Sequence, residues 1–166
     1  MRSLMIFASW LEATPFSVAC QKYSVWALPL CQILHFVGLC LLIGLAGFFD
    51  LRLLGFMKRV PVSAAFKFMP LAIFGLLLNL VTGLYMIVVN PSDFIPNPAM
   101  WAKMSFLVVA GLNALIFQVT LSDKLRKLGP EQDMPGAFKV VGAVSLFAWF
   151  AVMYFGRMLP YLGNAF

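Results

Sequence analysis

The chain has 166 residues, of which 63% are hydrophobic and only 11% are charged. Soluble domains usually carry about 25% charged residues, so a soluble fold of this length would expose far more apolar surface than soluble monomers tolerate. The formal net charge is +6, but the lysines and arginines gather between hydrophobic stretches, which indicates membrane topology and not nucleic-acid binding. The composition therefore predicts an all-α integral membrane bundle in a lipid bilayer.

The first segment, residues 1–24, is predicted to lie on the membrane surface without crossing it. Apolar residues recur at helical spacing at Leu4, Phe7 and Leu11. This is the pattern of a short amphipathic interfacial helix. Thr14 and Pro15 then resemble an N-cap followed by a first helical residue, so a second short helix is expected to lead into the first span.

Four later stretches are long and apolar enough to cross a hydrocarbon core of about 30 Å, which takes roughly 20 residues of helix. They are residues 25–49, 70–89, 101–121 and 138–158. Residues 25–166 are therefore expected to form one domain, a bundle of four transmembrane helices that follows the interfacial segment.

The connections between the spans differ in charge. The first and third carry eight of the twelve lysines and arginines, whereas the second, residues 90–100, has Asp93 and no cation. The positive-inside rule places the first and third connections in the cytoplasm. We therefore expect a multi-pass protein of the bacterial inner membrane with both termini in the periplasm.

The single histidine, His35, is the first candidate for chemistry. It lies about ten residues into the first span, which places it ~15 Å from the outer boundary and near the middle of the membrane. An ionisable side chain at that depth usually has a function. A neutral imidazole in an apolar bundle suits an axial ligand of haem b. It can equally bond to Asn79, Thr82 or a backbone carbonyl and fix helix packing.

Three further residues bear on the haem hypothesis. Gly38, one turn beyond His35, either leaves room for a flat macrocycle or lets two helices approach closely. Arg157, at the outer end of the fourth span, can bind an anionic group such as a haem propionate or a lipid phosphate, or extend to the headgroups. Lys103, at the outer start of the third span, has the same two interpretations.

One histidine per chain restricts the ligand set. A haem with two histidine ligands requires a symmetric interface between two copies, which predicts a homo-oligomer; otherwise the sixth ligand is methionine, water or absent. Cys31 shares a helix face with His35, and with a methionine the pair would suit Cu(I). Copper is the weaker hypothesis, because two ligands do not complete a site and buried cysteine usually serves as a small hydrophobic residue.

Other polar residues carry less information. Asp50 and Arg52, near the inner end of the first span, are two residues apart and do not face each other on a helix, so each is expected to pair with a neighbouring helix or loop. The metalloprotease, P-loop and dinucleotide-binding motifs of soluble enzymes are absent from the sequence.

Several blocks of the sequence resemble the signature of a family of small bacterial membrane proteins of unknown function. They are His35-Phe36-Val37-Gly38, Asp50-Leu51-Arg52-Leu53-Leu54-Gly55, Thr82-Gly83, Asn97-Pro98, Lys103-Met104, Ala110-Gly111-Leu112-Asn113-Ala114 and Gly156-Arg157. The resemblance covers nearly the whole chain, and the blocks DLRLLG and AGLNA are the most specific. It implies a four-helix inner-membrane protein and no established activity.

The resemblance also marks polar positions. Those that match family motifs are His35, Asp50, Arg52, Lys103, Asn113 and Arg157. The chain departs from the family pattern at Gln118, where many relatives have histidine. A looser architectural similarity, in helix number and membrane histidine, extends to four-helix b-type cytochromes and copper-resistance membrane proteins.

The sequence therefore predicts a membrane-embedded b-type haem protein with an electron-transfer or redox role, with His35 as axial ligand and Gly38 and Arg157 in the binding site. The first alternative is a non-catalytic scaffold or assembly subunit with a membrane or periplasmic partner, in which His35 only packs helices together. The second is an oligomeric transporter or channel subunit, although ion pathways generally align several ionisable groups and the predicted spans hold only His35 at depth.

Overall fold

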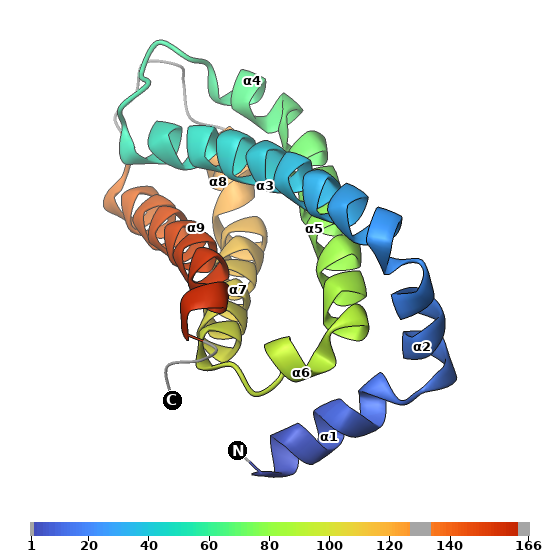
Figure 1. The fold of residues 1–166 in the computed structure, drawn as a ribbon. Coiled ribbons are helices and arrows are strands. Elements are labelled where there is room, and N and C mark those ends of the chain that lie inside the picture. The colour runs from blue at the N-terminus through green and yellow to red at the C-terminus, as the bar shows by residue number, and fades with distance from the viewer. Residues whose placement is uncertain (1, 127–133, 163–166) are drawn as a thin grey trace.

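The computed structural model describes residues 2–126 and 134–162, and every regular element among them is a helix (Figure 1). Four helices are long and apolar enough to cross a membrane. They are α3 (Ser24–Leu54), α5 (Met69–Val89), α7 (Pro98–Ile116), which continues through a π-helical turn (Phe117–Leu121) into α8 (Ser122–Arg126), and α9 (Gly136–Leu162). Each predicted span falls inside one of them, and the predicted all-α membrane bundle is confirmed.

The surface of the bundle is apolar along all four long helices. Large side chains such as Trp26, Val81 and Val119 are exposed by 86%, 67% and 76%. Contiguous exposure of this kind is unfavourable in water and ordinary in lipid, where hydrocarbon surrounds the helices. The structure therefore agrees with a lipid bilayer as the environment of the chain.

Helix α3 is longer than the first predicted span and carries Asp50 and Arg52 inside its last turns. It ends at Gly55, which has a φ of 93° and donates from its amide to the carbonyl of Arg52, while Phe56 donates to that of Leu51. This is a Schellman motif, and its left-handed residue strongly favours glycine. The last residue of the DLRLLG block is thus the helix stop.

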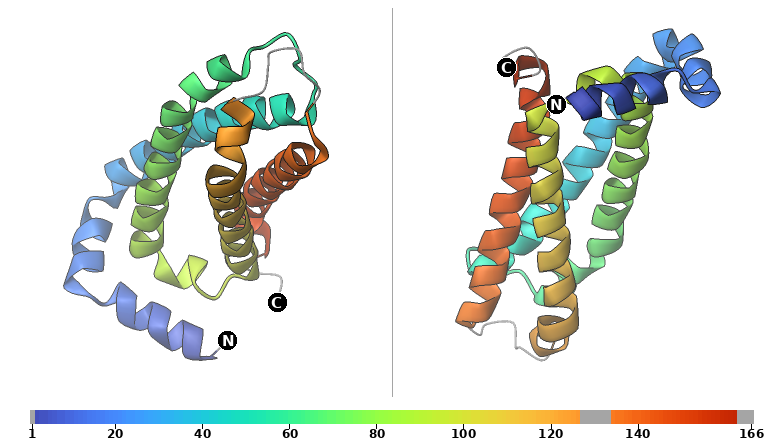
Figure 2. Two further views of the ribbon diagram at one scale, coloured as in Figure 1. Left: turned by 180° about the vertical axis from the view of Figure 1, so that it is seen from behind. Right: turned by 90° about the horizontal axis from the view of Figure 1, so that it is seen from below.

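Helix α3 runs across the bundle and packs on both α5 and α9, and α7 packs on α9, whereas α5 and α7 make no extensive contact (Figures 1 and 2). Glycines allow the close crossings. A Cβ on Gly75 would lie 2.8 Å from the carbonyl oxygen of Gly38, and a Cβ on Gly142 would lie 2.9 Å from that of Asp50. At both crossings the backbones of two helices touch directly.

The N-terminal segment forms two short helices, α1 (Arg2–Glu12) and α2 (Pro15–Lys22), bent by 68° relative to each other. The side chain of Thr14 accepts a hydrogen bond from the Ser17 amide, as the predicted N-cap requires. Ser17 in turn donates from its hydroxyl to the carbonyl of Val88 at 2.7 Å and fastens α2 to α5. Figure 2 shows α1 lying across one end of the bundle, beside α6 (Pro91–Phe94).

The connections contain more helix than the sequence predicts. The turn-rich second connection includes α6, because Pro91 stands at the first helical position, where proline's missing N–H is not needed. The first connection includes α4 (Val62–Lys67). Helices α4 and α8 lie at one end of the bundle, and α1 and α6 lie at the other (Figure 2).

Candidate functional site

His35 lies beside α5 at the α3–α5 crossing. Its Nδ1 atom is 2.8 Å from the hydroxyl oxygen of Thr82, and its side chain is half-buried. Thr82 is one of the partners that the sequence offered for this histidine. The other, Asn79, instead donates to the carbonyl of Gly75 in its own helix at 2.9 Å.

The hydrogen bonds of Thr82 fix the protonation pattern of His35. A hydroxyl has one hydrogen, and the hydroxyl of Thr82 donates it to the carbonyl of Leu78 at 2.6 Å. We therefore assign the same oxygen as the acceptor toward His35, with the ring proton on Nδ1. Because a neutral imidazole has only one N–H, Nε2 keeps its lone pair. This arrangement, an oriented ring with one basic nitrogen left over, is the one that metal-binding histidines commonly have.

Cys31 supports the same contact one turn along α3. Its thiol is buried and donates to the backbone carbonyl of Thr82 at 3.3 Å. Cys31 and His35 thus both contact Thr82, one through the backbone and one through the side chain. Over residues 2–126 and 134–162, the structure contains no group of three or more histidine, cysteine or acidic side chains arranged to hold a metal ion.

Gly38 lets two helices approach closely, which is the second of the two roles that the sequence allowed. A Cβ at this position would lie 2.6 Å from the Asn79 amide nitrogen and 2.9 Å from the carbonyl oxygen of Gly75. The space beside Gly38 is therefore filled by α5, which leaves no room there for a flat ring. Because Gly38 has no side chain, α3 and α5 lie close enough for His35 to contact Thr82.

Lys103 of α7 points into the bundle. Its side chain is half-buried and runs past Gly156 of α9, where a Cβ would lie 3.6 Å from the ammonium nitrogen. Its charge also lies within electrostatic range of His35. Gly83 of α5 also lies close to the histidine, because a Cβ on Gly83 would lie 3.6 Å from the Cε1 atom of the His35 ring. The sequence named each of these residues as a motif position but gave no sign that they converge.

Arg157 lies apart from this group. Its side chain is exposed, and its contact is with Tyr161 one turn further along α9: Nη2 lies 3.5 Å from the hydroxyl oxygen and the guanidinium lies 5.6 Å from the ring centroid. The structure thus brings Lys103 within electrostatic range of His35, whereas the side chain of Arg157 contacts Tyr161.

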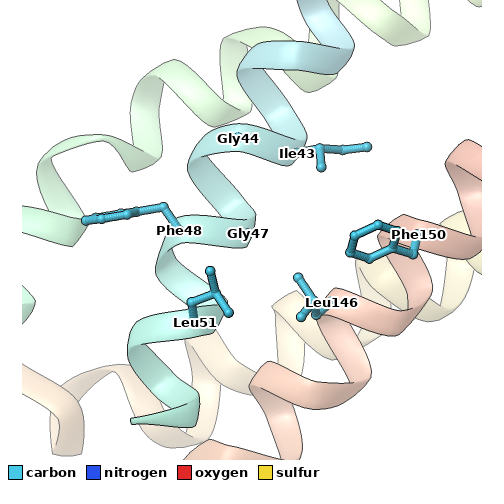
Figure 3. Close-up of a pocket in the computed structure, with 7 residues that line it drawn as sticks. All are labelled: Ile43, Gly44, Gly47, Phe48, Leu51, Leu146 and Phe150. Carbon is cyan, nitrogen blue, oxygen red and sulfur yellow. The ribbon is translucent and has the colours of Figure 1, made fainter. Parts of the chain in front are cut away.

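The pocket of about 470 Å³ on the bundle is a different feature (Figure 3). It lies between α3 and α9 and is lined by apolar side chains together with Gly44 and Gly47. Neither His35 nor Lys103 lines it. The lining has no polar or titratable side chain. This pocket therefore presents an apolar surface without a group that could act as a catalyst or a metal ligand.

The two charged residues near the end of α3 have separate partners, as expected from their spacing. Arg52 is 1% exposed and donates from Nε to the carbonyl of Val60 in the following loop at 2.8 Å. Asp50 is 4% exposed and forms a side-chain hydrogen bond with Ser145 of α9. The sequence placed both residues beyond the span, whereas the structure buries them inside α3.

Comparison with known proteins yields a family and no activity. Searches of curated proteins and of solved structures each found no significant match. The family of unknown function DUF6644 matches residues 7–162, nearly the full length, which confirms the resemblance carried by the sequence motifs. The chain therefore belongs to the family of unknown function DUF6644.

Proposed function

We propose that the protein is a small membrane-embedded b-type haem protein with an electron-transfer role, in which His35 is an axial ligand. One observation carries the proposal: Nδ1 of His35 lies 2.8 Å from the Thr82 hydroxyl inside an apolar bundle, and from this contact we assign the ring proton to Nδ1 and a free lone pair to Nε2. Bound haem would supply a site that gains and loses one electron.

The residues around His35 have defined tasks in this proposal. Thr82 orients the imidazole, since second-shell hydrogen bonds set the direction and basicity of such ligands. The Gly38–Gly75 crossing holds α3 at the distance at which that bond forms. Lys103 supplies a positive charge for an anionic side group such as a propionate. Arg157 remains a candidate for a second anionic group at the surface of the bundle.

A second copy of the chain is the natural source of a second ligand. With one histidine per chain, two imidazoles can meet on one iron only where two copies join about a symmetry axis. We therefore propose a homo-oligomer with one haem for two chains. A haem-to-chain ratio of one to two supports this arrangement, and a ratio of one to one assigns the sixth position to methionine, water or no ligand.

We also propose that the protein resides in a bacterial inner membrane with both termini in the periplasm. The support is the excess of lysine and arginine in the first and third connections, together with the position of α4 and α8, which belong to these two connections, at the same end of the bundle (Figure 2). Cysteine-accessibility labelling at Ser92, between α5 and α7, tests the orientation: labelling in intact spheroplasts supports it.

The haem proposal is tested by the absorption spectrum of protein purified from haem-replete cells. We expect a Soret band in the wild type and its loss in His35→Ala, with both proteins eluting as the same assembly. Cys31→Ala is the matched control, because it removes a neighbouring contact to Thr82 and should keep the band. A colourless wild type, or a Soret band that survives in His35→Ala, would overturn the proposal.

A non-catalytic scaffold is the second candidate, and one observation favours it. His35 and Cys31 both hydrogen-bond to Thr82, which by itself joins α3 to α5 without any ligand. In that case His35→Asn, which keeps a hydrogen-bonding group, should leave assembly unchanged. Recovery of one stable partner in stoichiometric amount would favour this function over the haem protein.

A further inference from the structure

A second polar site lies at the other glycine crossing, between α3 and α9. Gly142 of α9 sits directly against the backbone of α3, so that a Cβ there would lie 2.9 Å from the carbonyl oxygen of Asp50 and 3.0 Å from the Cβ of Leu53. Asp50 is 4% exposed, and its side chain hydrogen-bonds to Ser145 of α9. A carboxyl group is thus enclosed between two membrane helices.

The partners of this carboxyl are few. The Ser145 hydroxyl hydrogen-bonds to it, while its Oδ2 atom is buried and makes no hydrogen bond with any residue that the structure describes. The bond to Ser145 therefore involves Oδ1. An ionised carboxylate needs hydrogen bonds or a counter-charge on both oxygens when it is buried. A neutral carboxyl, with one oxygen bonded and the other a carbonyl, loses far less when its second oxygen has no partner.

Three cations on α3 and on the helices that pack against it are exposed or have another partner. Arg52, on the same helix, donates from Nε toward the loop carbonyl of Val60. On the elements that pack against α3, the side chains of Lys67 on α4 and Lys139 on α9 are exposed. The residues of α9 in contact with Asp50, Gly142 and Ser145, do not ionise. The geometry around the carboxyl therefore favours its uncharged form.

A bound metal cation fits the site poorly. Sodium and calcium ions are usually bound by about six oxygen ligands. The side chains of Asp50 and Ser145 supply only part of such a set. The part of the chain that the structure describes holds no cluster of three acidic, histidine or cysteine side chains. A proton needs only the carboxyl oxygen to which it is bound and one hydrogen-bond partner. Asp50 and Ser145 therefore suffice to bind a proton.

We propose that Asp50 is a proton-binding site of the membrane domain, which carries its proton at neutral pH while its carboxyl shares a hydrogen bond with the Ser145 hydroxyl. Ionisable groups buried in membrane bundles are rare and commonly take part in proton transfer. The site is separate from His35, and the inference does not depend on haem binding.

Infrared spectroscopy of the purified protein at neutral pH tests the proposal, because a carboxylic acid and a carboxylate absorb at different frequencies. The difference spectrum between the wild type and Asp50→Asn should show the carbonyl band of one protonated carboxyl, shifted downward in heavy water. Loss of carboxylate bands instead would overturn the proposal. Asn is neutral and nearly isosteric, so we expect Asp50→Asn to keep the assembly and thermal stability of the wild type.

A second variant tests the hydrogen bond and does not depend on the folding of Asp50→Asn. In Ser145→Ala the carboxyl loses its hydrogen-bond partner, and its carbonyl band should move to higher frequency. With aspartate labelled with ¹³C at the carboxyl carbon, this band must also shift, which assigns it to one of the four aspartates and not to glutamate. The proposal is contradicted if the wild-type protein shows no protonated-carboxyl band that shifts on labelling of aspartate. It is also contradicted if this band has the same frequency in Ser145→Ala as in the wild type.

Discussion

The hydrogen bond between His35 and Thr82 can be measured by replacing Thr82 with valine, which keeps the shape of the side chain and removes its hydroxyl. The hydroxyl accepts from Nδ1 of His35 at 2.8 Å and donates to the Leu78 carbonyl. Hydrogen bonds between membrane helices are worth about 0.6 kcal/mol on average and up to about 1.7 kcal/mol. Because the half-buried N–H of the ring would lose its acceptor, we expect Thr82→Val to lower the free energy of unfolding by about 1–1.7 kcal/mol.

Unfolding in mixed micelles measures this free energy, and a double-mutant cycle with His35→Leu isolates the pair, since each single change also alters other contacts. A coupling energy of about 0.6–1.7 kcal/mol is expected. Nitrogen NMR provides an independent measurement, because the chain has one histidine and its ring signals need no assignment. The wild type should carry its proton on Nδ1. A coupling near zero, or a ring protonated on Nε2, would refute the assignment of the free nitrogen.

Two further substitutions test the packing that positions the site. Gly75→Ala should destabilise the bundle by about 1–3 kcal/mol, as overpacking does, because its Cβ would lie 2.8 Å from the Gly38 carbonyl oxygen. Gly44→Ala is the control. A Cβ at Gly44 would have no neighbour within 4 Å, so this change should leave the free energy of unfolding unaltered in the same experiment. Asn97→Ala should cost about 1–2 kcal/mol, because Asn97 accepts from Ala99 to cap α7 and donates to the Leu159 carbonyl at 2.9 Å. Thermal denaturation followed by circular dichroism measures this cost, with Ser3→Ala at an exposed position as the surface control.

The long helices could be predicted from hydropathy because lipid-facing residues dominate their composition. The ends were harder to place. Asp50 and Arg52 lower the hydropathy of the last turns of α3, so the predicted span stops at residue 49, yet both side chains are buried against α9 and a loop. The signal that could have extended the helix is Gly55, since a glycine shortly after charged helical residues is a common stop.

The site was harder to predict because it depends on which faces of different helices meet. The sequence offered Thr82 as a partner of His35 because a threonine inside an apolar span needs a hydrogen bond. It left two roles open for Gly38, and only the position of Gly75, 37 residues later in the sequence, decides between them. The approach of Lys103 toward His35 is a property of the bundle that no local pattern in α7 indicates.

The two polar sites lie at the two places where α3 touches a neighbour backbone to backbone. This coincidence has a physical cause. Where Gly38 meets Gly75, and where Gly142 meets the backbone of Asp50, the two helices are in direct backbone contact, so a buried polar side chain beside the crossing needs a hydrogen-bond partner or a ligand. Thr82 meets this need for one nitrogen of His35 and Ser145 for one oxygen of Asp50. The second nitrogen of His35 and the second oxygen of Asp50 remain, and for that reason they are the atoms at which we place ligand binding and protonation.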